Sequence, residues 1–123
     1  MVVLNARDLP ALRRFYIALG WPERAGASDS LAMFELGATV LTLHPAPSAT
    51  EGRSDGEGVS PATTLVINVQ SREGVDAAVA ASVAAGARRV SDPTNQSWGG
   101  RSAVVADPEG NHWELLWVPS AGL

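Results

Sequence analysis

Short alternating segments and two segments with helical periodicity divide this chain of 123 residues into two similar halves. In the first half, an apolar run predicts a strand over residues 2–6. Asp8 then supplies a side chain that can begin a helix over residues 8–19. Strands over 31–36 and 39–43 follow, joined by a hairpin turn.

The second half repeats this order after residues 45–62, a stretch without periodicity that is rich in Pro, Ser, Gly and acidic residues. Such a composition is typical of a linker. A strand is then predicted over residues 63–69 and a helix with a stripe of valines over 71–85. A short edge strand over 88–91 and a closing hairpin over 102–118 complete the half.

Two halves of this kind predict a duplicated α+β fold, in which two paired βαβββ modules form curved mixed sheets of eight strands around a cavity. We predict one domain over residues 1–123, with module one at 1–44, the linker at 45–62 and module two at 63–118. Each sheet would pack one face against its helix and leave the other face free.

The residues with the clearest chemistry lie near the end of the chain. Asp-Pro-Glu-Gly at 107–110 predicts a tight hairpin turn, because Asp accepts local backbone hydrogen bonds, Pro fixes φ and Gly tolerates positive φ. On the strand that follows, His112 and Glu114 lie on one face and Trp113 on the other. A carboxylate among so many apolar residues needs a partner or a function, so Glu114 is the leading site candidate.

The turn at 107–111, Asp-Pro-Glu-Gly-Asn, is followed by an aromatic residue and Glu114, and this ending resembles that of the vicinal oxygen chelate superfamily. The superfamily includes glyoxalase I, extradiol dioxygenases and bleomycin-resistance proteins. Residues 2–9 and the motifs Phe15-Tyr16 and Leu19-Gly20-Trp21 are similar to its opening strand and helix. The resemblance covers nearly the whole chain and implies the paired-module fold and a homodimer.

Metal-dependent members of this superfamily hold a divalent metal with four His, Gln or Glu side chains on cavity-facing strands. The resemblance and the internal repeat place these positions at Met1, Leu41, Thr64 and Glu114. Only Glu114 suits a divalent metal, and one carboxylate does not hold such an ion. An upstream start codon that restores a ligand near Met1, or recruitment of His44 and His112, would add ligands, but we predict no metal and no cofactor.

Composition narrows the function classes further. The chain is 46% hydrophobic and 18% charged, as in globular proteins. Without cysteine it has no disulfide, thiolate metal site or thiol nucleophile, and without lysine it has no Schiff-base chemistry. A net charge of −4 argues against nucleic acid as a partner and favours a cationic or neutral small ligand. No signal peptide or membrane-spanning run is evident, so a cytoplasmic location without membrane partners is expected.

The function predicted from the sequence is metal-independent binding or sequestration of a small, planar or cationic molecule, similar to that of bleomycin-resistance proteins. Trp98 would offer a stacking surface, and Arg101 would bind an anionic group or hold Glu114. The predicted ligand-binding residues are Met33, Leu41, Trp98, Arg101, His112 and Glu114. The alternatives are a metal-dependent lyase, isomerase or dioxygenase, and a metal-free enzyme that uses Glu114 for proton transfer.

Overall fold

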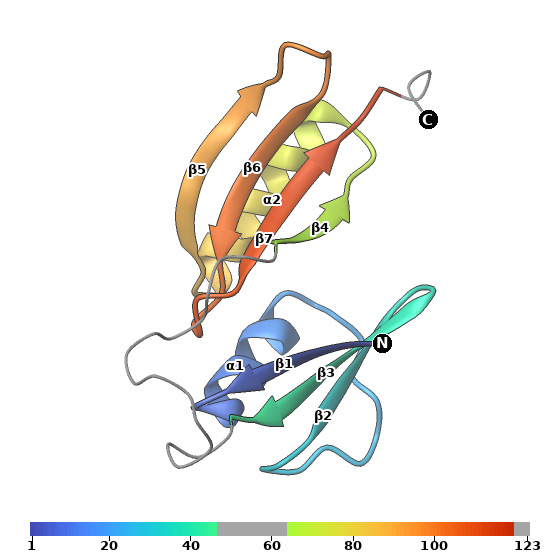
Figure 1. Cartoon of the computed structure of the whole chain (residues 1–123), viewed down its shortest axis with the longest axis vertical. Coiled ribbons are helices and arrows are strands. Elements are labelled where there is room, and N and C mark those ends of the chain that lie inside the picture. The colour runs from blue at the N-terminus through green and yellow to red at the C-terminus, as the bar shows by residue number, and fades with distance from the viewer. Residues whose placement is uncertain (47–63, 120–123) are drawn as a thin grey trace. The chain divides into compact units, whose positions relative to one another are not determined.

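The computed structural model describes residues 1–46 and 64–119, so the predicted linker lies almost wholly outside the described residues (Figure 1). The chain divides into two compact units, Met1–Val59 and Ser60–Leu123. The single domain over residues 1–123 stays a prediction.

The described part of the first unit, residues 1–46, contains one helix and three strands. β1 (Val2–Ala6) is followed by α1 (Leu9–Ala18), β2 (Ala32–Leu36) and β3 (Thr39–Pro45). The sheet has the order β1-β3-β2, in which β1 runs parallel and β2 antiparallel to the central β3. β3 extends two residues beyond its predicted end, because its last residues still pair with the end of β1.

The core of the first unit lies between α1 and one face of this sheet. Its fully buried large side chains are Leu12, Tyr16, Phe34, Leu41 and Leu43. The Tyr16 ring stacks on Trp21, with ring centroids 4.9 Å apart, and also contacts Phe34. The apolar face predicted for α1 is therefore confirmed, and the sheet buries the alternate residues of β2 and β3 against it.

The fourth strand that the paired-module fold predicts for the first unit is reduced to isolated bridges. Glu23 forms an antiparallel bridge with Phe34, and Arg24 N donates a hydrogen bond of 2.9 Å to Met33 O. This short segment follows the edge of β2 without continuing as a strand. The described residues consequently contain seven strands instead of the predicted eight.

The described part of the second unit, residues 64–119, contains one helix and four strands. Its elements are β4 (Thr64–Asn68), α2 (Arg72–Ala85), β5 (Arg88–Asn95), β6 (Arg101–Ala106) and β7 (His112–Trp117). The sheet has the order β4-β7-β6-β5, with β4 parallel to β7 and the remaining neighbours antiparallel. Figure 1 shows α2 lying along one face of this sheet. The predicted α+β class is confirmed, with two open mixed sheets and a helix for each.

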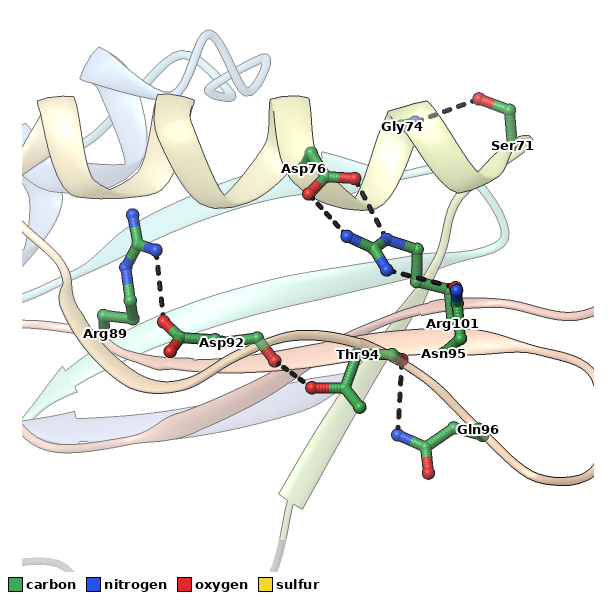
Figure 2. A network of polar contacts seen from close by, with 9 residues as sticks. All are labelled: Ser71, Gly74, Asp76, Arg89, Asp92, Thr94, Asn95, Gln96 and Arg101. Carbon is green, nitrogen blue, oxygen red and sulfur yellow. Dashed lines mark hydrogen bonds and ion pairs between the residues drawn. The ribbon is translucent and has the colours of Figure 1, made fainter.

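Both helices begin and end where the sequence predicts. The side chains of Asp8 and Ser71 accept hydrogen bonds from the backbone N–H three residues later, at 3.1 and 2.9 Å (Figure 2 shows the second). Gly20 and Gly86 leave the helices with φ of 85° and 118°, which residues with a Cβ rarely adopt. These local signals fix the ends of the helices before any packing is considered.

The valine stripe predicted along α2 is only partly confirmed. Val75 and Val79 are buried against the sheet, whereas Val83 is 40% exposed. Successive steps of four residues rotate by about 40° around a helix of 3.6 residues per turn, so the third valine leaves the buried face. Ser82 takes the buried position, and its hydroxyl donates a hydrogen bond of 2.7 Å to Ala78 O.

The edge strand β5 is longer than the predicted segment 88–91. It continues through Pro93 to Asn95, with register shifts on both sides of Ser91. Proline is tolerated there because the outer edge of an edge strand makes no ladder hydrogen bonds.

Neither α1 nor α2, the helices of the described residues, has the length and apolar character that a membrane-spanning helix needs.

Candidate functional site

The turn before β7 is built around the carboxylate of Asp107, which is only 4% exposed. Its Oδ1 accepts hydrogen bonds from the backbone N–H groups of Glu109 and Asn111, each at 2.9 Å. Its Oδ2 accepts one from Asn111 Nδ2, also at 2.9 Å. Gly110 completes the turn with φ of 89°. This hydrogen-bonded turn fixes the residue at which β7 begins, and hence the face on which each of its side chains lies.

Glu114 lies on the sheet face turned away from α2. Trp113 and Leu115, on the other face, are buried at 5% and 3% exposure and form the core with α2. Glu114 pairs with Val66 of β4 on one side and Val104 of β6 on the other. The predicted alternation of β7 is therefore confirmed.

The Glu114 carboxylate is half-buried and makes no hydrogen bond or ion pair with any residue that the structure describes. Its two cross-strand neighbours, Val66 and Val104, are apolar. An unpaired carboxylate in such surroundings can accept hydrogen bonds from a cationic or polar group of a ligand. Val66 is 47% exposed, so this part of the face is open.

Arg101 does not hold Glu114, and that part of the sequence prediction is wrong. Arg101 lies on the α2 face of the sheet, where its Nε and Nη2 donate hydrogen bonds of 3.0 and 2.9 Å to the carboxylate of Asp76. Its Nη1 donates one of 3.0 Å to Asn95 Oδ1 (Figure 2). The hydrogen bond and charge of Arg101 lower the pKa of Asp76 below its ordinary value. Arg101 is thus engaged in a contact between β6 and α2.

Trp98 lies in the loop between β5 and β6, and its side chain is 56% exposed. Two backbone hydrogen bonds close this loop, from Gln96 N to Gly100 O at 2.7 Å and from Gly99 N to Gln96 O at 3.0 Å. The Trp98 ring packs so closely over Gly100 that a Cβ at residue 100 would overlap it. The indole is therefore an exposed surface held by its own loop, and its role as a ligand contact stays a prediction.

Replacing Gly100 by alanine tests this packing. The added Cβ would meet the Trp98 ring and would lie 2.6 Å from the Trp117 carbonyl oxygen, so we expect a loss of about 1–3 kcal/mol in the free energy of unfolding. Urea unfolding followed by circular dichroism measures it. The double variant with Trp98→Ala should recover only part of the loss, because the carbonyl remains. An unchanged stability of Gly100→Ala would contradict the packing.

His112 lies on the same face as Glu114, at the start of β7, where it pairs with Thr64 and Ala106. It is half-buried, and two residues along a strand separate it from Glu114, roughly 7 Å of strand rise. His44 is exposed near the end of β3 in the first unit. The structure therefore brings His112 and Glu114 to one face of the second unit.

In the first unit, Thr42 replaces Leu41 as the candidate site residue on β3. Leu41 is fully buried and pairs with Phe34 on the face packed against α1, so it is a core residue and the prediction that it contacts ligand is wrong. Thr42 pairs with Val3 and Met33 on the opposite face. Met33 thus lies on the face turned away from α1, and its role as a ligand contact stays a prediction.

The error has a local cause in the two hairpin turns. Leu41 follows from matching the glycines of both turns, but the β2–β3 turn joins the paired residues Leu36 and Thr39, whereas the β6–β7 turn joins Ala106 and His112. Both strands begin two residues after the glycine of their turn, Gly37 or Gly110, but Thr39 lies on the α1 face of its sheet whereas His112 lies on the face turned away from α2. The equal spacing therefore places Leu41 in the core and Glu114 on the other face. Pairing shows the correct equivalence, because Thr42 lies beside Val3 as Glu114 lies beside Val66.

The side chains at the four corrected positions do not fit a divalent metal centre. These positions hold Met1, Thr42, Thr64 and Glu114. A thioether, two hydroxyls and one carboxylate are not a donor set for such an ion, which generally needs about three His or carboxylate ligands. Among residues 1–46 and 64–119, no three His, Asp or Glu side chains group as metal ligands would. The ligand set of the metal-dependent members is therefore not reproduced in the described residues.

Comparisons with known proteins agree on a glyoxalase-like family. A model of a glyoxalase-like domain matches residues 1–116. A glyoxalase-related enzyme from Fulvimarina pelagi has 26% sequence identity and a TM-score of 0.79, over 96% of this chain and 86% of that chain. A glyoxalase/bleomycin resistance protein/dioxygenase family enzyme from Burkholderia phytofirmans PsJN has 23% identity and a TM-score of 0.81, over 96% of each chain.

A third similar structure is lactoylglutathione lyase from Agrobacterium tumefaciens, with 20% identity and a TM-score of 0.72 over 94% of this chain and 90% of that chain. At such low identity this structure and the one from Burkholderia phytofirmans PsJN show a shared fold alone. No curated protein matches the sequence.

Proposed function

Because this chain belongs to the glyoxalase-like domain family of the vicinal oxygen chelate superfamily, we propose that it binds a small organic molecule without a metal ion. The observation that supports this function is the half-buried Glu114 carboxylate, which lies between Val66 and Val104 and has no polar partner among the described residues. Glu114 would orient a cationic or hydrogen-bond-donating group of the ligand.

Leaving such a carboxylate without a polar partner costs free energy. A partly buried anion loses hydration, and a structural role would normally restore hydrogen bonds from a nearby donor. Arg101, a cation on the next strand, is instead bound to Asp76 on the other face. A positively charged ligand group would supply the missing partner, and a planar apolar body would cover the exposed Val66. The net charge of −4 also favours a cation.

The test uses thioflavin T, a planar cation, and its uncharged benzothiazole analogue, each titrated calorimetrically into the full chain. Glu114→Gln keeps the shape of the side chain and removes its charge, so we expect thioflavin T affinity to fall about tenfold and that of the neutral analogue to change little. Glu73→Gln is the matched control, because Glu73 is exposed in the first turn of α2.

Equal losses for both probes, or equal effects of the two variants, would contradict a charge contact at Glu114.

Elemental analysis after exposure to nickel, zinc, manganese or iron(II) tests the alternative function, that of a metal-dependent enzyme. Near-stoichiometric metal that Glu114→Gln abolishes would favour the metal-dependent lyase, isomerase or dioxygenase. The homodimer and the cytoplasmic location stay predictions.

A further inference from the structure

The hydroxyl of Thr42 is a buried polar group without a hydrogen-bond partner among the described residues. Thr42 is 2% exposed, and its Oγ1 is the one such side-chain atom in that part of the chain. A hydroxyl in this state has lost hydration without compensation, which makes a threonine there less favourable than a valine of the same shape. The fold itself gives no reason for this hydroxyl.

A mainly apolar pocket lies at the edge of β2, the strand that pairs with Thr42. Residues 24–27 and 31–33 line this pocket, which has a volume of about 210 Å³. Its surface consists of alanines, Leu31 and the Met33 side chain, with Arg24 as the charged member. The Arg24 guanidinium is already bound, because it donates to the Glu35 carboxylate and contacts Met33 Sδ at 3.9 Å. The surface of the pocket is therefore mainly, though not wholly, apolar.

Met33 connects the pocket with the hydroxyl. It lines the pocket and is also the direct cross-strand neighbour of Thr42, so the two side chains lie on the same face of the sheet. Such neighbours have Cβ atoms about 5 Å apart. The methionine side chain is unbranched and changes rotamer readily, so a bound molecule can move it aside without disturbing β2.

We infer that this pocket binds a small aromatic molecule carrying one hydrogen-bonding group, with the ring against Met33 and the polar group on the Thr42 hydroxyl. An apolar cavity of roughly 150 Å³ accepts benzene, so a pocket of about 210 Å³ has room for one substituted ring. Thioethers make favourable contacts with aromatic rings. The site lies in the first unit and does not depend on Glu114 or on the function proposed for it.

The experiment compares 4-fluorophenol with fluorobenzene, which lacks the hydroxyl, by fluorine NMR titration of the full chain. We expect the wild-type protein to bind the phenol about fivefold more tightly. Thr42→Val should remove this preference and leave fluorobenzene affinity within about twofold, since only the hydroxyl changes. Ala27→Phe should weaken both probes by filling the pocket, and Thr39→Val is the matched control on β3.

The thermal midpoint of Thr42→Val separates a ligand contact from a structural role. A hydroxyl without a partner predicts a midpoint equal to or above that of the wild type, whereas a lowered midpoint would overturn the inference. The inference also fails if both probes bind the wild type equally or if Ala27→Phe leaves binding unchanged. Glu114→Gln should alter neither titration, so the failure of one site is distinguishable from that of the other.

Discussion

Replacing Asp107 by alanine is expected to lower the free energy of unfolding by about 3–4 kcal/mol. The carboxylate accepts three hydrogen bonds in the turn before β7, two from backbone N–H groups and one from the Asn111 amide. Both Asp107 and Asn111 are more than nine-tenths buried, so water cannot easily replace the lost acceptor. The substitution therefore leaves buried donors unsatisfied, which costs more than the loss of an exposed contact.

Urea unfolding measures the loss, and hydrogen exchange of peptides from β6 and β7 locates it. Asp92→Ala is the matched control in the same unit, because the Asp92 side chain is 77% exposed and forms an exposed ion pair with Arg89. It should cost less than about 0.5 kcal/mol. Asp107→Asn should lie between the two, since it keeps one acceptor oxygen for the backbone donors. Equal losses for Asp92→Ala and Asp107→Ala would contradict this account of the turn.

The same turn explains how much of the site could be predicted from sequence. Asp107 and Gly110 carry local signals, and each acts on residues no more than four positions away. From them the start of β7 and the face of Glu114 follow directly. The helix ends at Gly20 and Gly86 were predictable for the same reason, because a glycine after a periodic segment carries its own conformational preference.

Contacts between distant residues could not be predicted in this way. Arg101 is 25 residues from Asp76, and only the packing of α2 on the sheet brings the two together. Proximity in sequence favoured Glu114 as its partner, but β6 places Arg101 on the opposite face. β5 likewise extends to Asn95 because β6 pairs with it, although the sequence predicted an edge strand that ends at residue 91. In each case tertiary pairing overrides a local preference.

The position of Leu41 depends on a finer detail, the face on which the strand leaves its turn. A glycine marks both hairpin turns, at Gly37 and Gly110, with φ of 71° and 89°, and each following strand begins two residues later. The first residue of β3 nevertheless faces α1, whereas the first residue of β7 faces away from α2. Nothing in the first turn fixes this face as clearly as the hydrogen bonds of Asp107 fix it for β7. A one-residue error was enough to exchange a core leucine for the neighbouring Thr42.

Replacing Leu41 by alanine is consequently expected to lower the free energy of unfolding by about 3–4 kcal/mol. Leu41 is fully buried, lies between Val2 and Phe34 in the sheet and packs on the α1 side, so its removal leaves a cavity that the surrounding strands cannot easily close. Urea unfolding gives the size of the loss. Faster hydrogen exchange in peptides from β1 to β3 would assign it to the first unit.

Val3→Ala is the control for Leu41→Ala, because Val3 is on the same sheet, faces away from α1 and is 51% exposed. Its truncation should cost less than about 1 kcal/mol, since most of the side chain is already in water. A ligand-contacting leucine would behave in the opposite way, with little loss of stability and a clear loss of probe binding. If Leu41→Ala is no more destabilising than Val3→Ala, Leu41 is not a core residue and the pairing that places Thr42 on the free face fails with it.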